Sequence, residues 1–253
     1  MSKLSLLAMT TVVACATIAS AEPNRSYFTR ENKFPELGQF ELGATVDSKE
    51  FDAGKIGEAA AYGRYGLIEN LTANVRVPYR DIDPDFGDGD SGLGDVSLGL
   101  ELLAYQDIFD YPYVIPHVDV SLETGDDETG LGAGETITTV GISAGTKTYE
   151  VLHWILDVSY LINGTNISED EDSDDLLKVS LALIWDVSDR FAWHLEGQVT
   201  DEDVEGSDQP AAFVGGFTYD WTESFVTSFY AGAGSDEGST PDAIAGAKAS
   251  YTF

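Results

Sequence analysis

Hydrophobic and polar residues alternate strictly in short stretches along most of the chain. In the stretch RFAWHLEGQVT at 190–200, Phe191, Trp193 and Leu195 alternate with His194 and Glu196. A period of two residues places successive side chains on opposite faces of an extended strand. The stretch therefore predicts a β-strand with one apolar face and one polar face.

The same pattern recurs between turn-forming residues until the end of the chain. No stretch after residue 21 has a convincing 3.6-residue periodicity of the kind that an amphipathic helix would show. The pattern predicts an all-β fold with twelve strands at about 38–48, 54–67, 70–80, 93–104, 112–124, 136–148, 151–162, 175–186, 190–200, 210–219, 223–233 and 242–253.

The connections between these strands alternate in character. Those after the even-numbered strands are short, such as IEN at 68–70 and DWTES at 220–224. Those after most odd-numbered strands are longer and acidic, such as TGDDETGLGAGE at 124–135 and NGTNISEDEDSDD at 163–175. Tight turns at one rim and long loops at the other predict an up-and-down antiparallel sheet.

Two features favour a transmembrane barrel over a soluble secreted β-sandwich, which alternates in the same way. Every Lys and Arg well inside a predicted strand falls on the polar face, and a lipid-facing Lys or Arg at mid-depth costs about 2–4 kcal/mol. Aromatic residues gather where strands meet short turns, as they do at lipid–water interfaces. The predicted belt includes all four tryptophans and comprises Tyr65, Tyr105, Trp154, Trp185, Trp193, Trp221, Tyr251 and Phe253.

A sheet in a bilayer must close, because an unpaired strand edge cannot be hydrated there. The prediction is therefore a closed antiparallel barrel over 37–253, with short periplasmic turns and long acidic extracellular loops. An even number of strands puts both ends of the barrel at the short-turn rim, so residues 22–36 are expected to form an irregular periplasmic segment. The terminal Phe253, with Tyr251 before it, resembles the signal read by the outer-membrane assembly machinery, although Lys248 stands where that signal usually carries glycine.

The first 21 residues have the form of a cleaved export signal. A lysine near the start, an apolar run and the small residues Ala19-Ser20-Ala21 precede Glu22. The run is short for a membrane anchor, and lipoprotein processing at Cys15 is a second alternative. Cleavage after Ala21 removes the only cysteine, and the loss of Lys3 changes the formal charge from −32 to −33. So acidic a chain repels nucleic acid.

Several glycine-rich strand ends resemble the outer-membrane family named for the MetA pathway of phenol degradation, whose members are also described as transporters. These are FTRENKFPELGQFELGA at 28–44, GRYGLIENL at 63–71, GLGDVSLGLELL at 92–103 and VDVSLETGDDETGLGAGE at 118–135. They cover about the first half of the mature chain, whereas the second half matches in architecture. The resemblance implies a Gram-negative outer-membrane barrel through which aromatic or other small apolar compounds pass.

The polar faces of the predicted strands would line the barrel interior. Opposite charges on these faces are close to balance, so one reading is a bore closed by ion pairs. The other is a narrow polar lumen that conducts small solutes, since twelve strands lie between filled eight-stranded barrels and open sixteen-stranded porins. Glu41 and Glu123 also fall on this face. The residues expected to line the lumen are Glu58, Arg64, Arg76, Arg80, Asp95, Glu101, His117, Asp119, Lys147, His153, Asp157, Lys178, His194, Glu196 and Lys248.

Catalysis and metal binding have weaker support in the sequence. The three histidines have no accompanying serine motif, so a lipid-modifying enzyme is the minor alternative and structural hydrogen bonding is the default. The stretch DPDFGDGDSGLGD departs from the EF-hand pattern, and a solvated loop is favoured over a weak divalent cation site at Asp83, Asp85, Asp88 and Asp90. No cofactor is expected.

The sequence thus predicts an outer-membrane channel for passive passage of small, apolar or aromatic solutes. Its partners would be outer-membrane lipid and lipopolysaccharide, to which divalent cations at the acidic rim could bridge. A non-conducting structural or surface-interaction barrel is the first alternative.

Overall fold

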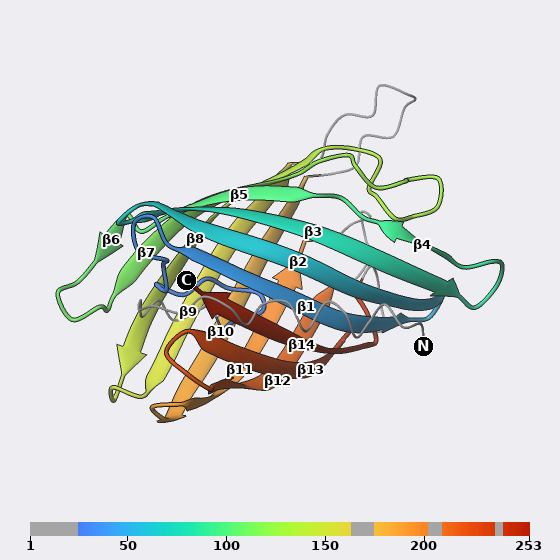
Figure 1. The fold of residues 1–253 in the computed structure, drawn as a ribbon. Coiled ribbons are helices and arrows are strands. Elements are labelled where there is room, and N and C mark those ends of the chain that lie inside the picture. Colours follow the sequence, from blue (N-terminus) through green and yellow to red (C-terminus); the bar gives the residue numbers. More distant parts are fainter. Residues whose placement is uncertain (1–24, 163–174, 202–208, 236–239) are drawn as a thin grey trace.

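The computed structural model describes residues 25–162, 175–201, 209–235 and 240–253. It is built from strands that form one closed, tilted sheet (Figure 1). The strands are β1 (Phe40–Phe51), β2 (Gly54–Ile68), β3 (Leu71–Pro84), β4 (Asp90–Leu93), β5 (Ser97–Leu102), β6 (Tyr105–Gln106), β7 (Tyr113–Ser121), β8 (Ile137–Thr148), β9 (Leu152–Ile162), β10 (Leu176–Ser188), β11 (Phe191–Thr200), β12 (Ala211–Asp220), β13 (Phe225–Gly234) and β14 (Ala243–Thr252).

The barrel closes where β1 pairs with β14, from Glu41 opposite Thr252 to Glu50 opposite Ala243. Every neighbouring pair of strands around the sheet is antiparallel, so the predicted closed barrel of twelve strands is confirmed. One of the twelve predicted strands is divided into the short strands β4, β5 and β6. Of these, β4 pairs with β3, β5 pairs with β3 and β7, and β6 pairs with β7. The strand expected at 93–104 is therefore interrupted between Leu93 and Ser97.

The register puts apolar residues outside and polar residues inside. Trp185 lies opposite Trp193, and the next inward pair is Ile184 opposite His194. Trp193 is 49% exposed whereas His194 is 4% exposed. A soluble protein shows the reverse distribution, so the outer surface suits hydrocarbon. Within the described residues, no helix is long and apolar enough to cross a membrane.

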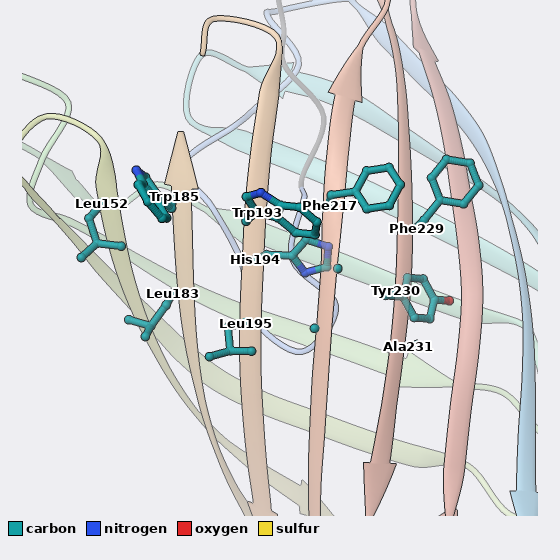
Figure 2. A pocket seen from close by; sticks show the side chains of 12 residues that line it. Leu152, Leu183, Trp185, Trp193, His194, Leu195, Phe217, Phe229, Tyr230 and Ala231 are labelled. Atoms are coloured by element: carbon teal, nitrogen blue, oxygen red, sulfur yellow. The ribbon is translucent and has the colours of Figure 1, made fainter. Parts of the chain in front are cut away.

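Aromatic side chains form a band on the outer face near the short-turn rim. Figure 2 shows Trp185, Trp193, Phe217 and Phe229 at one level on adjacent strands. The ring centroids of Trp193 and Phe217 are 5.6 Å apart, and those of Phe217 and Phe229 are 5.3 Å apart. The other residues of the predicted belt also lie near short turns and are at least partly exposed: Tyr65, Tyr105, Trp154, Trp221, Tyr251 and Phe253.

The N-terminal segment is irregular, as expected, but it does not lie below the barrel. Residues 25–34 run inside it, because their partners come from strands on different sides of the wall: Asp186 on β10, Glu196 on β11, Glu101 on β5 and Asp119 on β7. This placement corrects the expectation of a periplasmic segment. The alternation of strand residues carries no information about a segment that satisfies its polar groups against the inner wall.

The loops at the other rim are only partly described. Residues 163–174, 202–208 and 236–239, which fall in three of the predicted acidic loops, lie outside the described residues, as do the predicted export signal and Cys15. The β7–β8 loop is described and packs against the break between β4 and β5. Asp95 accepts hydrogen bonds from the backbone N–H groups of Thr124, Gly125 and Ala133 at 3.0, 2.8 and 2.7 Å.

Candidate functional site: the barrel interior

The N-terminal segment is held inside the barrel by charged groups at three points. Glu196 accepts hydrogen bonds from the backbone N–H groups of Tyr27 and Phe28 at 2.6 and 2.8 Å. The Arg25 guanidinium is 2.8 Å from Glu31 and 2.6 Å from Asp186. Burial alone would lower the pKa of Arg25, but the charges of Glu31 and Asp186 outweigh this effect and raise the pKa above its usual range. The segment is thus fixed by specific polar contacts.

The third point is an ion-pair network around Arg64. The Arg64 guanidinium is 2.8 Å from Glu41 and 3.0 Å from Glu101, and it donates a hydrogen bond of 2.9 Å to the backbone oxygen of Lys33. Arg30 of the segment joins Glu101 at 3.1 Å and also pairs with Asp119. Buried ions of this kind require partners, and removing one leaves the others uncompensated.

In the described part of the chain, the segment lies between two cavities of the interior. The short-turn chamber has a volume of about 770 Å³ and its lining includes Lys147, His153 and Asp186. The long-loop chamber has a volume of about 520 Å³ and its lining includes Arg76, Tyr62 and Lys248. Arg25 lines both chambers, so the segment is the partition between them.

Several predicted lumen residues meet in the long-loop chamber. Glu58 pairs with both Arg76 and Arg80, the latter at 2.9 Å. Lys178 and Lys248 line the same chamber from β10 and β14. Asp95 instead fastens the β7–β8 loop, and Glu123, expected on the inner face, is exposed beyond the end of β7.

The three histidines lie apart and each faces a different carboxylate. His117 is 3.0 Å from Asp157, which also accepts hydrogen bonds from Ser143 and Ser159. His153 contacts Asp186 and the Tyr111 hydroxyl, both at 2.5 Å. The Nδ1 atom of His194 is 3.3 Å from Glu196. Because both serine hydroxyls donate to Asp157, neither is arranged as a nucleophile activated by histidine.

The remaining residues that the sequence singled out also lie in separate parts of the molecule. Lys147 is 3.9 Å from Asp186 and 5.6 Å from the centre of the Tyr111 ring, so it belongs to the short-turn chamber. Among the described residues no group of three or more His, Cys, Asp or Glu side chains could hold a metal ion. The cluster considered for a cation at Asp83, Asp85, Asp88 and Asp90 falls within that described part, so its carboxylates are not gathered into a site.

Sequence reasoning missed the contribution of the N-terminal segment to the interior. Arg25, Glu31 and Arg30 occur where no periodic pattern exists, so nothing in the sequence signals their position. Asp186 could have been found, because it continues the inward series of Ala182 and Ile184 on β10.

Comparisons with known proteins agree with this geometry. The model of the family described as "Putative MetA-pathway of phenol degradation" matches residues 28–253. The chain belongs to this family. The match extends from the segment inside the barrel to the last residue, well beyond the stretches in which the sequence alone shows the resemblance. No curated protein sequence matches the chain significantly.

Solved structures with the same architecture come from outer-membrane proteins. An outer membrane channel from Pseudomonas putida F1 has a TM-score of 0.71 at 14% identity, over 86% of this chain and 96% of that chain. The KdgM porin has a TM-score of 0.58 at 6% identity, with coverage of 84% and 99%. The translocator domain of the autotransporter NalP from Neisseria meningitidis has a TM-score of 0.52 at 14% identity, with coverage of 85% and 88%. At these identities the likeness concerns the fold.

Proposed function

We propose that this barrel is an outer-membrane channel for passive passage of small apolar or aromatic solutes. The observation that carries the proposal is the pair of chambers of about 770 and 520 Å³ that meet at Arg25. A solute would move from one chamber to the other when residues 25–34 shift from the inner wall. Besides the packing of Tyr27 and Phe28 against the wall, the segment is held by polar bonds at a few points, and water or a solute can replace these.

The outer face supports the proposed location in a membrane. Its exposed side chains are apolar along every long strand, including Val75 on β3, Leu156 on β9 and Leu181 on β10. We place the short-turn rim on the periplasmic side and the acidic loops outside, next to lipopolysaccharide. In this arrangement an export signal at 1–21 and the terminal Phe253 would serve secretion and barrel assembly.

The aromatic groove on the outer face is part of the same surface. It has a volume of about 600 Å³ and lies over Gly215 and Ala231, where small residues leave room between Trp193, Phe217 and Phe229 (Figure 2). Because it faces outward in the aromatic band, we assign it to lipid acyl chains and not to the solute path.

A structural barrel without transport is the second candidate. The observation that favours it is the buried network of Arg64, Glu41 and Glu101, which Arg30 ties to the N-terminal segment. The two candidates differ in one property: a channel must allow residues 25–34 to move, whereas a structural barrel keeps them docked. A catalytic role has less support, since the similar solved structures are a channel, a porin and a translocator domain.

Reconstituted vesicles separate these candidates. Purified full-length protein would be incorporated into vesicles, and entry of phenol and benzyl alcohol would be compared with entry into protein-free vesicles of equal lipid composition. A channel predicts faster entry, and a further increase when Glu196→Gln weakens the attachment of the segment. Equal entry with and without protein, for both the unaltered chain and the variant, would refute transport of these solutes.

A further inference from the structure

The long-loop chamber combines two kinds of lining that the channel function alone does not require. One side carries aromatic rings from the N-terminal segment and the wall: Tyr27, Phe28 and Tyr230. The Tyr27 ring is 4.7 Å from the rings of both Phe28 and Tyr230, so these three form a packed aromatic surface. Such a surface accepts a planar apolar ring.

The other side carries positive charge, in what we call the cationic wall: Lys49 and Arg76 line the chamber, and Arg80 adjoins Arg76 through Glu58. Arg76 and Arg80 share the single carboxylate of Glu58, so one positive charge remains uncompensated within this trio. Lys49 is paired more loosely, at 3.6 Å from Asp47. Among these close groups there are three cations and two carboxylates.

The two cations of this wall that line the chamber are much more exposed than its carboxylates. The side chains of Arg76 and Lys49 are 36% and 30% exposed, whereas those of Glu58 and Asp47 are 6% and 4% exposed. A solute in the chamber would therefore contact the guanidinium and ammonium groups more readily than the carboxylates. Elsewhere in the chamber, Arg64 and Arg30 are engaged with Glu41, Glu101 and Asp119, and Lys178 on β10 and Lys248 on β14 also line it.

The aromatic surface and the cationic wall are close to each other. The carboxylates Asp47 and Glu58 are near enough to the Tyr27 hydroxyl to add to the effect of burial, and together they raise the pKa of Tyr27. Arg76 opposes this increase, so it also acts on the same hydroxyl. One small molecule could thus contact both surfaces.

The formal charge of −32 does not prevent an anion from binding here. Exposed charges are screened over about 8 Å at physiological ionic strength, whereas groups lining a narrow enclosed space are screened much less. At contact distance the cationic wall decides the local potential.

We propose that the long-loop chamber is a binding site for small aromatic carboxylates, with the carboxylate at the cationic wall and the ring against Tyr27, Phe28 and Tyr230. The site rests on the proposed channel function and narrows its solute class. Charge-assisted hydrogen bonds to guanidinium are about twice as strong as neutral ones, so a carboxylate gains more at this wall than a neutral phenol. An aliphatic acid would lack the contact with the rings.

Calorimetric titration of the purified, full-length protein in detergent tests the site without any need for transport. The probes are sodium benzoate, benzyl alcohol, which keeps the ring, and sodium acetate, which keeps the charge. We expect benzoate to bind about tenfold more tightly than benzyl alcohol, as one charge-assisted hydrogen bond implies, and more tightly than acetate, which lacks the contact with the rings. Benzoate binding that is no tighter than that of benzyl alcohol would overturn the proposal.

Single substitutions in the wall give effects of opposite sign. Arg76→Gln should weaken benzoate binding about tenfold, and Arg76→Lys should weaken it less. Glu58→Gln removes the carboxylate that competes for both arginines, so it should tighten benzoate binding several-fold. A residue that only supports the fold would not produce tighter binding. Lys55→Gln, at the exposed start of β2, is the control and should leave the affinity unchanged.

Each variant is first checked for the heat-dependent gel migration of a folded barrel. If Arg76→Gln does not fold, the result with Glu58→Gln still decides, and unchanged or weaker binding in that variant would refute the role of the wall. Measurements of solute entry into vesicles distinguish the proposed binding site from the proposed channel function. Faster entry of benzyl alcohol without preferential benzoate binding would refute this site and leave the channel intact, whereas benzoate binding without entry of either solute would refute the channel alone.

Discussion

Glu196 on β11 accepts a hydrogen bond of 2.6 Å from the backbone N–H of Tyr27, which belongs to a segment 169 residues earlier in the chain. The same carboxylate accepts a second bond, of 2.8 Å, from the N–H of Phe28. Glu196 is 1% exposed, so these bonds are formed away from bulk water. One strand residue thereby fixes the position of the partition between the two chambers.

Weakening this attachment should loosen the N-terminal segment. Glu196→Gln removes the negative charge and leaves one amide oxygen for two donors, which should cost about 1–3 kcal/mol of docking free energy. We expect faster cleavage by trypsin after Arg25 and Arg30 and a higher conductance in planar bilayers.

The matched control is Glu223→Gln, which makes the same change on the exposed β12–β13 turn. It should change neither property. If Glu196→Gln is cleaved at the same rate as the unaltered protein, Glu196 does not hold the segment.

The barrel could be predicted from the sequence, whereas the arrangement of its interior could not. Alternation around Trp193 and His194 fixes which side chains point inward, because a strand has a period of two. It also places Glu196 on the inner face. It does not say which group Glu196 meets, since its partners are backbone N–H groups of a segment with no periodic pattern.

The break between β4 and β5 was missed for a related reason. The strand predicted at 93–104 contains Gly94 and Gly99, and glycine does not distinguish a strand from a bend. The cause of the bend lies elsewhere in the chain, where Asp95 turns inward to bind the N–H groups of the β7–β8 loop. Contacts between distant segments decide such details.

Two adjacent glycines on β12 should respond differently to the same substitution. A Cβ atom at Gly216 would lie 2.2 Å from the backbone oxygen of Phe229 and 2.4 Å from the His194 ring, whereas at Gly215 its nearest neighbour would be Leu195 at 3.5 Å. Gly216→Ala should therefore destabilise the barrel by about 1–3 kcal/mol. Gly215→Ala is the control and should be tolerated. The urea midpoint of each refolded variant measures the difference, and equal midpoints would contradict the close packing.

A charged residue on the outer face should be costly if that face meets lipid. Leu195 is 42% exposed and lies on the outer face, opposite Leu183 and Gly215. Leu195→Arg should reduce the free energy of unfolding in vesicles by about 2–4 kcal/mol. Phe86→Arg makes a comparable change in the β3–β4 connection, where Phe86 is 94% exposed, and should have little effect. A stable Leu195→Arg barrel would argue against a lipid-facing surface at this position.

Docking of the N-terminal segment should strengthen as the pH rises from about 8 to 9.5. Burial lowers the pKa of Lys33 from 10.5 to about 8, although Asp220 and Asp186 oppose this change. In that pH window a released segment binds the Lys33 proton while the docked segment has lost it. Raising the pH removes this advantage of the released state, so the ratio of docked to released protein increases by up to about tenfold per pH unit. Below pH 8 both states are protonated and docking should not vary with this group.

A spin label at Asn32→Cys would report the docked fraction, since the mature chain is expected to lack cysteine. Label mobility should fall between pH 8 and 9.5 in the otherwise unaltered chain. In a second protein that also carries Lys33→Met, the mobility should not change over this range. Above pH 10 the raised pKa of Tyr27 acts in the opposite direction, because the released tyrosine loses its proton first. If both proteins show the same dependence on pH, another group controls docking.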